Sequence, residues 1–293
     1  MKKIVFILSI FAASQTMAAC EQSNEQYTVL VQQFKQAQAS DADLIRKIEQ
    51  SLASCERHIG LRVLQGDIYS KQQNWAQAVK SYEGALQYAN IEAQTNPQQY
   101  MSVLFRLLSA NLWKKDRFEA SYLLTKIHAQ RQQGVALTPQ QEQTLKQADS
   151  MLNNDLQENP LSQNELTSLF SGNKRDFSLE PPALNYRISF DFDQDQPNAG
   201  GRKDIINAAT AMLAPEVKSI DVIGHTDKQG DDTYNQQLSL RRAQAVVSLL
   251  VSQHPTLAKK LSASGKGEQA LLYPGDSEDD HQLNRRVEFV FKR

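Results

Sequence analysis

The hydrophobic pattern at the start of the chain is that of a secretory signal peptide. Lys2 and Lys3 precede an apolar run over residues 4–13, and a short polar stretch then ends in Ala18 and Ala19. The apolar run is too short to span the roughly 30 Å of a bilayer core, and no later segment offers the 18 or so apolar residues that a membrane helix needs. We therefore expect residues 1–19 to be a cleaved signal peptide and the mature chain to have no transmembrane segment.

From residue 24 to about residue 155, apolar positions recur at helical spacing. The first two stripes are Tyr27, Leu30, Val31 and Phe34, then Leu44, Ile48 and Leu52. Helix starts are indicated by Ser40, which is suited to an N-cap, and by the prolines that follow Asn96 and Thr138. Helices in such close succession predict stacked antiparallel hairpins.

Within this region, small and aromatic residues resemble the tetratricopeptide (TPR) pattern. The residues at TPR offsets are Gly66, Tyr69, Trp75, Ala78, Tyr82 and Ala85, and a weaker unit follows with Leu108, Asn111, Ala120, Leu124 and Ile127. Small residues at Gly66 and Ala78 would let two helices approach closely, so core packing explains these positions without any ligand. We expect a TPR-like helical domain over residues 20–135, and the resemblance implies binding of an envelope protein whose identity the pattern does not specify.

A polar segment separates this helical half from the rest of the chain. Ser162 and Glu165 form a candidate capping box for a short helix, and Pro181 with Pro182 forbids helix beyond it. We therefore predict a helical, polar linker over residues 136–183 and a second domain over residues 184–293.

In the second domain the periodicity changes to an alternation of strands and helices. Apolar residues alternate with polar ones from Tyr186 to Phe192, and a second strand is predicted over residues 220–224. Helical stripes cover residues 205–213 and 235–254, and a last strand is predicted over residues 286–292. This order indicates an α+β fold of β/α/β/α/β type.

Many fixed positions in this domain resemble the OmpA-like C-terminal domain. The matching residues are Gly224-His225-Thr226-Asp227, Gly230, Tyr234-Asn235, Leu238-Ser239, Arg242-Ala243, Val246, Gly265-Lys266-Gly267-Glu268 and Asn284-Arg285-Arg286-Val287-Glu288. The resemblance implies non-covalent binding of peptidoglycan through the diaminopimelate of its stem peptide. It assigns Asp227 to the ammonium group and Arg242 to the carboxylate, with Asn235 and the loop backbone assisting, and it places Thr226 at the same site.

The same resemblance places Phe192 and Asp193 at the pocket. It also implies that residues 284–286 fix the position of the last strand. At least one of Arg285 and Arg286 is expected to be a solvated surface residue. The acidic segment over residues 269–282 departs from the family pattern, which leaves the pocket rim undefined.

The chemistry of the ligand favours the same two charged residues. The free end of diaminopimelate is a zwitterion, so its receptor needs an anion beside a planar guanidinium fork. Asp227 precedes the long predicted helix and Arg242 lies inside it, so both can face one crevice. A simple ion pair between Asp227 and Arg242 is the alternative, and it is compatible with a site that opens for ligand.

Composition and charge exclude one large class of partner. The chain has 293 residues, and 32 Lys and Arg against 33 Asp and Glu leave a net charge of −1. Binding to nucleic acid by counterion release needs a basic excess, so no nucleic-acid partner is expected. Hydrophobic content of 40% is ordinary for a folded chain.

The two cysteines allow two interpretations. A Cys20–Cys55 disulfide is favoured for a secreted chain, and closing a loop of this size would stabilise it by roughly 3 to 4 kcal/mol. Alternatively, Cys20 after Met17-Ala18-Ala19 weakly resembles a lipobox, which would anchor the protein to a membrane by lipid. In either case we expect the protein to be located in the periplasm or cell envelope. A lipid anchor at Cys20 would associate it with the outer membrane.

Catalysis is the rival class of function. His225 and Asp227 could begin a metal site of a periplasmic hydrolase, but the sequence offers no further ligands at suitable spacing and no nucleophile elbow or phosphate loop. We therefore expect a non-enzymatic protein without a cofactor. A second alternative is a scaffold of a secretion, motility or envelope-assembly machine in which wall binding only positions the protein.

Overall fold

The computed structural model describes residues 20–158, 183–184, 188, 190, 193–213 and 217–292. The signal peptide, the Ser162 capping box and the Pro181-Pro182 boundary therefore lie outside the described residues. Within the described part, the chain forms two compact units. The first unit runs to Glu119 and includes Gln132–Val135; the second comprises Ala120–Arg131 and Ala136–Arg293.

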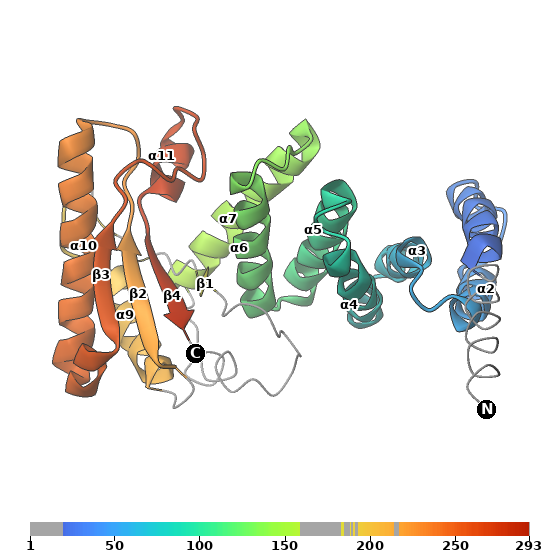
Figure 1. Ribbon diagram of the computed structural model, residues 1–293, viewed down its shortest axis with the longest axis horizontal. Helices are drawn as coiled ribbons and strands as arrows, with labels where there is room; N and C mark the ends of the chain where they lie inside the picture. Colours follow the sequence, from blue (N-terminus) through green and yellow to red (C-terminus); the bar gives the residue numbers. More distant parts are fainter. Residues whose placement is uncertain are drawn as a thin grey trace, which may run out of the picture. The chain divides into compact units, whose positions relative to one another are not determined.

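The first unit is entirely helical where it is described. Residues 20–35 form a helix, and the helices that follow are α2 (Asp41–Ser54), α3 (Ile59–Lys71), α4 (Trp75–Ile91) and α5 (Pro97–Lys114) (Figure 1). Consecutive helices pack against each other from α2 through α5. Ser40 accepts a hydrogen bond from the Asp43 amide, and Asn96 accepts one from the Gln99 amide with Pro97 at the first helical position. The predicted helix starts at Ser40 and Asn96 are thus confirmed.

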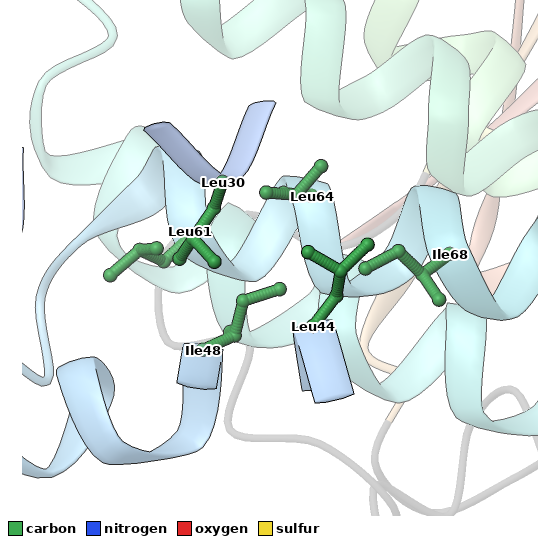
Figure 2. Packing of buried hydrophobic residues seen from close by; sticks show 6 residues of the cluster. All are labelled: Leu30, Leu44, Ile48, Leu61, Leu64 and Ile68. Carbon is green, nitrogen blue, oxygen red and sulfur yellow. The ribbon is translucent and has the colours of Figure 1, made fainter. Parts of the chain in front are cut away.

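The predicted stripes meet in one hydrophobic core at the start of this unit. Its buried members come from the helix over residues 20–35, from α2 and from α3: Leu30, Leu44, Ile48, Leu61, Leu64 and Ile68 (Figure 2). Tyr27, Val31, Phe34 and Leu52 pack around them. Burying one such aliphatic side chain contributes about 1.5 to 3 kcal/mol, so these contacts hold the three helices together.

A disulfide closes the same part of the chain. Cys20 and Cys55 are bonded with an S–S distance of 1.97 Å and a Cα–Cα distance of 5.0 Å. Cys20 lies at the start of the first described helix and Cys55 is the C-cap of α2. The bond therefore ties the two helices together across 35 positions of sequence.

The residues of the better TPR-like unit lie at a close helix contact. Ala78 is fully buried, and a Cβ added at Gly66 would lie 2.3 Å from the ring of Tyr82. The Tyr82 hydroxyl donates to Asp67 (2.7 Å), which also accepts from Arg106 (3.0 Å), so one polar network joins α3, α4 and α5. This arrangement fits the TPR-like hairpin that the spacing predicts.

The second unit combines helices with a four-stranded sheet. Its helices are α6 (Arg117–Gln132), most of which belongs here, α7 (Pro139–Glu158), α9 (Ala199–Met212), α10 (Asp232–Gln253) and α11 (Glu278–Asn284), with the 3-10 turn η1 (Pro255–Lys259). The strands are β1 (Ala183–Leu184), β2 (Ser219–Gly224), β3 (Leu261–Gly265) and β4 (Val287–Lys292), in the order β1-β4-β2-β3. β2 runs parallel to β3 and antiparallel to β4, and α10 packs against both β2 and β3 (Figure 1).

The α+β class of this unit is confirmed, and the structure adds two elements. The strand at residues 220–224, the long helix and the final strand are present as β2, α10 and β4. The predicted first strand lies largely outside the described residues, although Ile188 is fully buried. β3 and α11 were not predicted individually; α11 begins with a capping box between Ser277 and Asp280 inside the acidic segment.

The unit boundary differs in place from the domain boundaries suggested by the sequence. Contacts group Ala120–Arg131 and α7 with the sheet, whereas the polarity of the sequence suggests a helical domain ending at residue 135 and a linker from residue 136.

Among the described residues, no helix has both the length and the apolar character required to cross a bilayer.

Candidate functional site

One pocket of about 270 Å³ opens beside the end of β2 in the second unit. Its lining combines acidic, basic and amide side chains: Asp193, Thr226, Asp227, Gln229, Gly230, Tyr234, Asn235, Leu238, Arg242 and Arg285. Five of the six residues predicted for the site therefore share one cavity. The sixth, Phe192, lies outside the described residues.

The loop between β2 and α10 is shaped by side chains bonded to its own backbone. Asp231 caps α10 by accepting from the amides of Thr233 (2.8 Å) and Tyr234 (3.3 Å). Asp227 Oδ1 accepts from the Gln229 amide (2.9 Å), and Gly230 has a φ of +104°, which favours glycine. These bonds present the Asp227 carboxylate at the pocket wall while it stays only 4% exposed.

Asn235 ties this loop to the next one. Its Nδ2 donates to the carbonyl oxygen of Gln229 (3.1 Å) and to Glu268 Oε2 (2.7 Å). The side chain is 2% exposed, so the bonds that it makes are buried or nearly so. In the structure, Asn235 therefore orders the pocket wall.

Asp227 forms its ion pair with Arg285. Arg285 Nη1 lies 2.7 Å from Asp227 Oδ2, and Arg285 Nη2 lies 2.7 Å from Glu278 Oε1. Burial alone would lower the pKa of Arg285, but Glu278 and Asp227 outweigh it and raise that pKa above its ordinary value. The pairing of Asp227 with Arg242, considered from the sequence, is therefore not the one found.

The register of the sheet explains why Arg285 takes this place. β2 and β4 are antiparallel with Gly224 opposite Val287, and the His225 amide donates to the carbonyl oxygen of Arg286 (2.9 Å). Continuing this register brings Arg285 beside the residues that follow His225. From the sequence, Arg285 is expected only to hold the last strand; its position in the Asn284-Arg285-Arg286 motif is the available signal for a role at the pocket.

Arg242 is a buried cation that faces the same pocket. It is 1% exposed, its Nε donates to the carbonyl oxygen of Gln194 (2.9 Å), and its guanidinium lies 5.0 Å from the centre of the Phe190 ring. Burial, and then the nearby charge of Arg285, lower the pKa of Arg242 to about 10. No acidic side chain within the described ranges forms an ion pair with it, so an anionic ligand would relieve an electrostatic penalty.

Aromatic and charged side chains form one rim of the pocket. Tyr234 donates a short hydrogen bond from its hydroxyl to Asp193, and Arg241 lies 5.7 Å from the centre of the Tyr234 ring. Arg241 also pairs with Asp195 (3.3 Å). Asp193 has a φ of 58°, a left-handed conformation that places its carboxylate at this rim.

The expectation that Arg285 or Arg286 is a solvated surface residue is wrong. Arg286 is 1% exposed, and it donates from Nε to Glu288 (2.7 Å) and from Nη2 to the carbonyl oxygen of Ala270 (3.1 Å). The Arg285 side chain is 15% exposed because it lies between Asp227 and Glu278. Buried guanidinium groups need such partners, and the loop after β2, α11 and β4 supply the acidic ones.

His225 lies behind the pocket rather than in it. It is 3% exposed, and its Nε2 lies 3.4 Å from Glu288 Oε2. Burial lowers the pKa of His225, although Glu288 opposes the shift. No three His, Cys, Asp or Glu side chains in the described parts of the chain are grouped so as to hold a metal ion.

Comparisons with known proteins concern this part of the chain. Residues 189–285 match the model of the OmpA family. Outer membrane porin F of Pseudomonas aeruginosa is 38% identical over 101 residues, which are 34% of this chain and 29% of that protein. Outer membrane protein A of Escherichia coli O157:H7 is 40% identical over 87 residues, which are 29% of this chain and 25% of that protein.

The chain thus spans less than a third of the length of these two relatives. Among solved structures, the peptidoglycan-associated lipoprotein from Burkholderia pseudomallei is 26% identical with a TM-score of 0.33. The alignment covers 37% of this chain and 92% of that one.

Proposed function

Since residues 189–285 form a domain of the OmpA family, we propose that this protein is a non-catalytic component of the cell envelope that binds peptidoglycan. The ligand is the diaminopimelate of the stem peptide, and the helical unit binds an envelope protein. The observation that carries the proposal is a single pocket lined by Asp227, Arg242 and Arg285.

The pocket offers both charges that the free end of diaminopimelate requires. The ammonium group is assigned to Asp227, whose carboxylate has acceptor capacity beyond its bond to Arg285. The carboxylate group is assigned to Arg242, a buried cation that gains a counter-ion when the ligand binds. Asp193, Thr226 and Asn235 line the remaining wall, and the cavity volume suits the end of one amino-acid side chain.

The expected affinity is modest for one site. A charge-assisted hydrogen bond contributes about 1.5 to 3 kcal/mol, so two of them with a few amide contacts give a Kd between about 1 μM and 1 mM. The cell wall presents the ligand at high local density, so a released domain is recaptured promptly. Firm attachment therefore does not require a tight single site.

The location follows from the leader and from the state of Cys20. A secretory signal peptide and two outer-membrane relatives support the periplasm or cell envelope. Lipidation is not favoured, because the Cys20 sulfur is bonded to Cys55 and is not available for acylation.

Within the helical unit, Trp113 is 67% exposed and stacks on Trp75. This apolar surface lies on the unit to which we assign protein partners.

Sedimentation with purified diaminopimelate-type sacculi tests the site. We expect Asp227→Ala and Arg242→Ala each to weaken binding about 10- to 100-fold, the loss of one charge-assisted contact. Asp232→Ala and Arg46→Ala remove an acidic and a basic residue outside the pocket lining and should sediment as the parent does. If both site variants also sediment as the parent does, the assignment of Asp227 and Arg242 is wrong.

The same preparations distinguish binding from hydrolysis. The supernatant is assayed for soluble wall fragments, and the protein is analysed for bound metal. Released fragments that depend on His225 would replace the binding proposal with a metal-dependent hydrolase.

A further inference from the structure

A closed loop over residues 272–284 leads directly to Arg285, which lines the pocket. Asn284 is fully buried and its Oδ1 accepts from the amides of Leu272 (2.8 Å) and Tyr273 (3.1 Å), while its Nδ2 donates to the Tyr273 carbonyl oxygen (2.6 Å). These bonds join the two ends of the segment over residues 272–284, named here the rim segment. The next residue, Arg285, pairs with Asp227, so a displacement of the rim segment acts directly on the pocket.

Helices α6 and α7 hold one end of the rim segment through a buried polar cluster. The Tyr273 hydroxyl donates to Asp149 Oδ2, and His128 Nε2 lies 2.6 Å from the same oxygen. His128, Asp149 and Tyr273 are each at most 4% exposed, and the rings of His128 and Tyr273 meet edge to face at 5.8 Å. Arg131 adds a hydrogen bond to the Leu272 carbonyl oxygen.

A second contact lies further along the rim segment, at the start of α11. Lys146 of α7 lies 2.8 Å from Asp280 Oδ1 and donates to Ser277 Oγ (3.0 Å). Ser277 and Asp280 form the capping box of α11, the helix that leads to Asn284 and Arg285. The α6–α7 pair therefore contacts the rim segment at two places, Leu272–Tyr273 and Ser277–Asp280, and Lys146 bonds both members of the α11 capping box.

We propose that the α6–α7 pair is part of the ligand-binding module, with Tyr273 and Lys146 as positioning residues that keep Arg285 within reach of Asp227. None of these side chains lines the pocket, so each acts through Arg285 rather than on the ligand. The inference rests on the proposed function for its ligand, and it extends the functional module to Ala120. The peptidoglycan-binding module is then longer than the segment that resembles the OmpA family.

The first test needs no ligand. In the full-length protein, amide hydrogen exchange is compared for the parent, Tyr273→Phe and Lys146→Met. We expect faster exchange at Leu272 and Tyr273, and at Gln229, whose amide is held by Asp227. Tyr100→Phe removes a buried phenol hydroxyl from the helical unit and is the matched control, with no change expected at these amides.

The second test uses a diaminopimelate-containing muropeptide and a double-mutant cycle. Tyr273→Phe should raise the Kd about 10-fold, which corresponds to about 1.4 kcal/mol. In an Arg285→Gln background the same substitution should change the Kd much less, because Arg285 transmits the effect. A purely structural role of Tyr273 predicts equal fold-changes in the two backgrounds and would overturn the proposal.

The two tests separate the positioning role from the identity of the ligand. If the parent protein does not bind the muropeptide but Tyr273→Phe still speeds exchange at Gln229, the positioning role stands and the ligand assignment fails. If exchange at Gln229 is unchanged in both variants, the positioning role is wrong whatever the parent binds.

Discussion

At the scale of single residues, the buried charged groups of the second unit separate into those paired behind the pocket and those that line it. Arg286 and Glu288 pair with each other behind the pocket, and His225 lies against Glu288. Burial alone would raise the pKa of Glu288, but Arg286 and His225 outweigh it and hold that pKa well below its ordinary value. Arg242, by contrast, faces the cavity without such a partner in the described residues.

The buried His225 predicts a dependence of stability on pH. Its pKa is lower in the folded state than the ordinary value of 6.5, so the unfolded chain binds the proton more readily. Its contribution to the free energy of unfolding is complete above pH 6.5 and is lost as the pH falls below that value. The pKa of Glu288 is depressed, so its contribution to the free energy of unfolding is lost only as the pH falls below the ordinary value of 4.5.

Urea unfolding at a series of pH values between pH 8 and pH 4 tests this prediction. The parent should lose stability between pH 8 and pH 5.5, and His225→Gln should flatten that part of the curve without altering the loss near pH 4. Parallel pH profiles for the two proteins would contradict the assigned role of His225.

At the scale of elements, the pocket depends on the close approach of β2 to α10. A Cβ added at Gly224 would lie 2.0 Å from the Ser239 carbonyl oxygen, which belongs to the backbone and has little freedom to move. The Ser239 hydroxyl accepts from the Gly267 amide (2.9 Å), so the same helix turn also holds the loop after β3. The position of Asp227, three residues after Gly224, follows from this contact.

Gly224→Ala should therefore destabilise the second unit by about 3 kcal/mol or more, because the strand and helix must separate. Chemical denaturation monitored by circular dichroism measures the loss. Gly200→Ala is the matched control: it lies in the first turn of α9 with its nearest neighbour, Asn198 Oδ1, at 3.5 Å, and should not be destabilising. Equal stability of the two variants would show that β2 and α10 tolerate a wider spacing.

At the scale of the whole molecule, the two compact units have different sources of stability. The helical unit contains the Cys20–Cys55 disulfide, whereas the pocket lies entirely in the second unit. Cross-linking across 35 positions restricts the unfolded chain and stabilises the fold by roughly 3 to 4 kcal/mol.

Replacing both cysteines by serine should remove that stabilisation from the helical unit and leave sedimentation with sacculi unchanged. Denaturation curves give the first quantity, and the sedimentation assay gives the second. Mass spectrometry of the mature N-terminus accompanies this experiment, because an acylated Cys20 would contradict the disulfide and move the protein to a lipid anchor.

Local sequence signals predicted much of the fold because their physical causes are local. Ser40 and Asn96 cap helices through their own neighbouring amides, and the alternation at residues 219–224 needs only one buried face. The motif residues Asp227 and Arg242 were identified through the resemblance to the OmpA-like domain, and the chemistry of a zwitterionic ligand agrees with them.

Tertiary structure alone decided which charges meet and what supports them. Arg285 pairs with Asp227 across 58 positions because β2 and β4 are antiparallel in one particular register, and no local pattern specifies that register. Tyr273 reaches Asp149 across 124 positions for a similar reason. The sequence by itself determined the helices, the main strands and the chemical types in the pocket. Long-range packing determined the Asp227–Arg285 ion pair and the contacts of α6 and α7 with residues 272–280, because these join segments far apart in the chain.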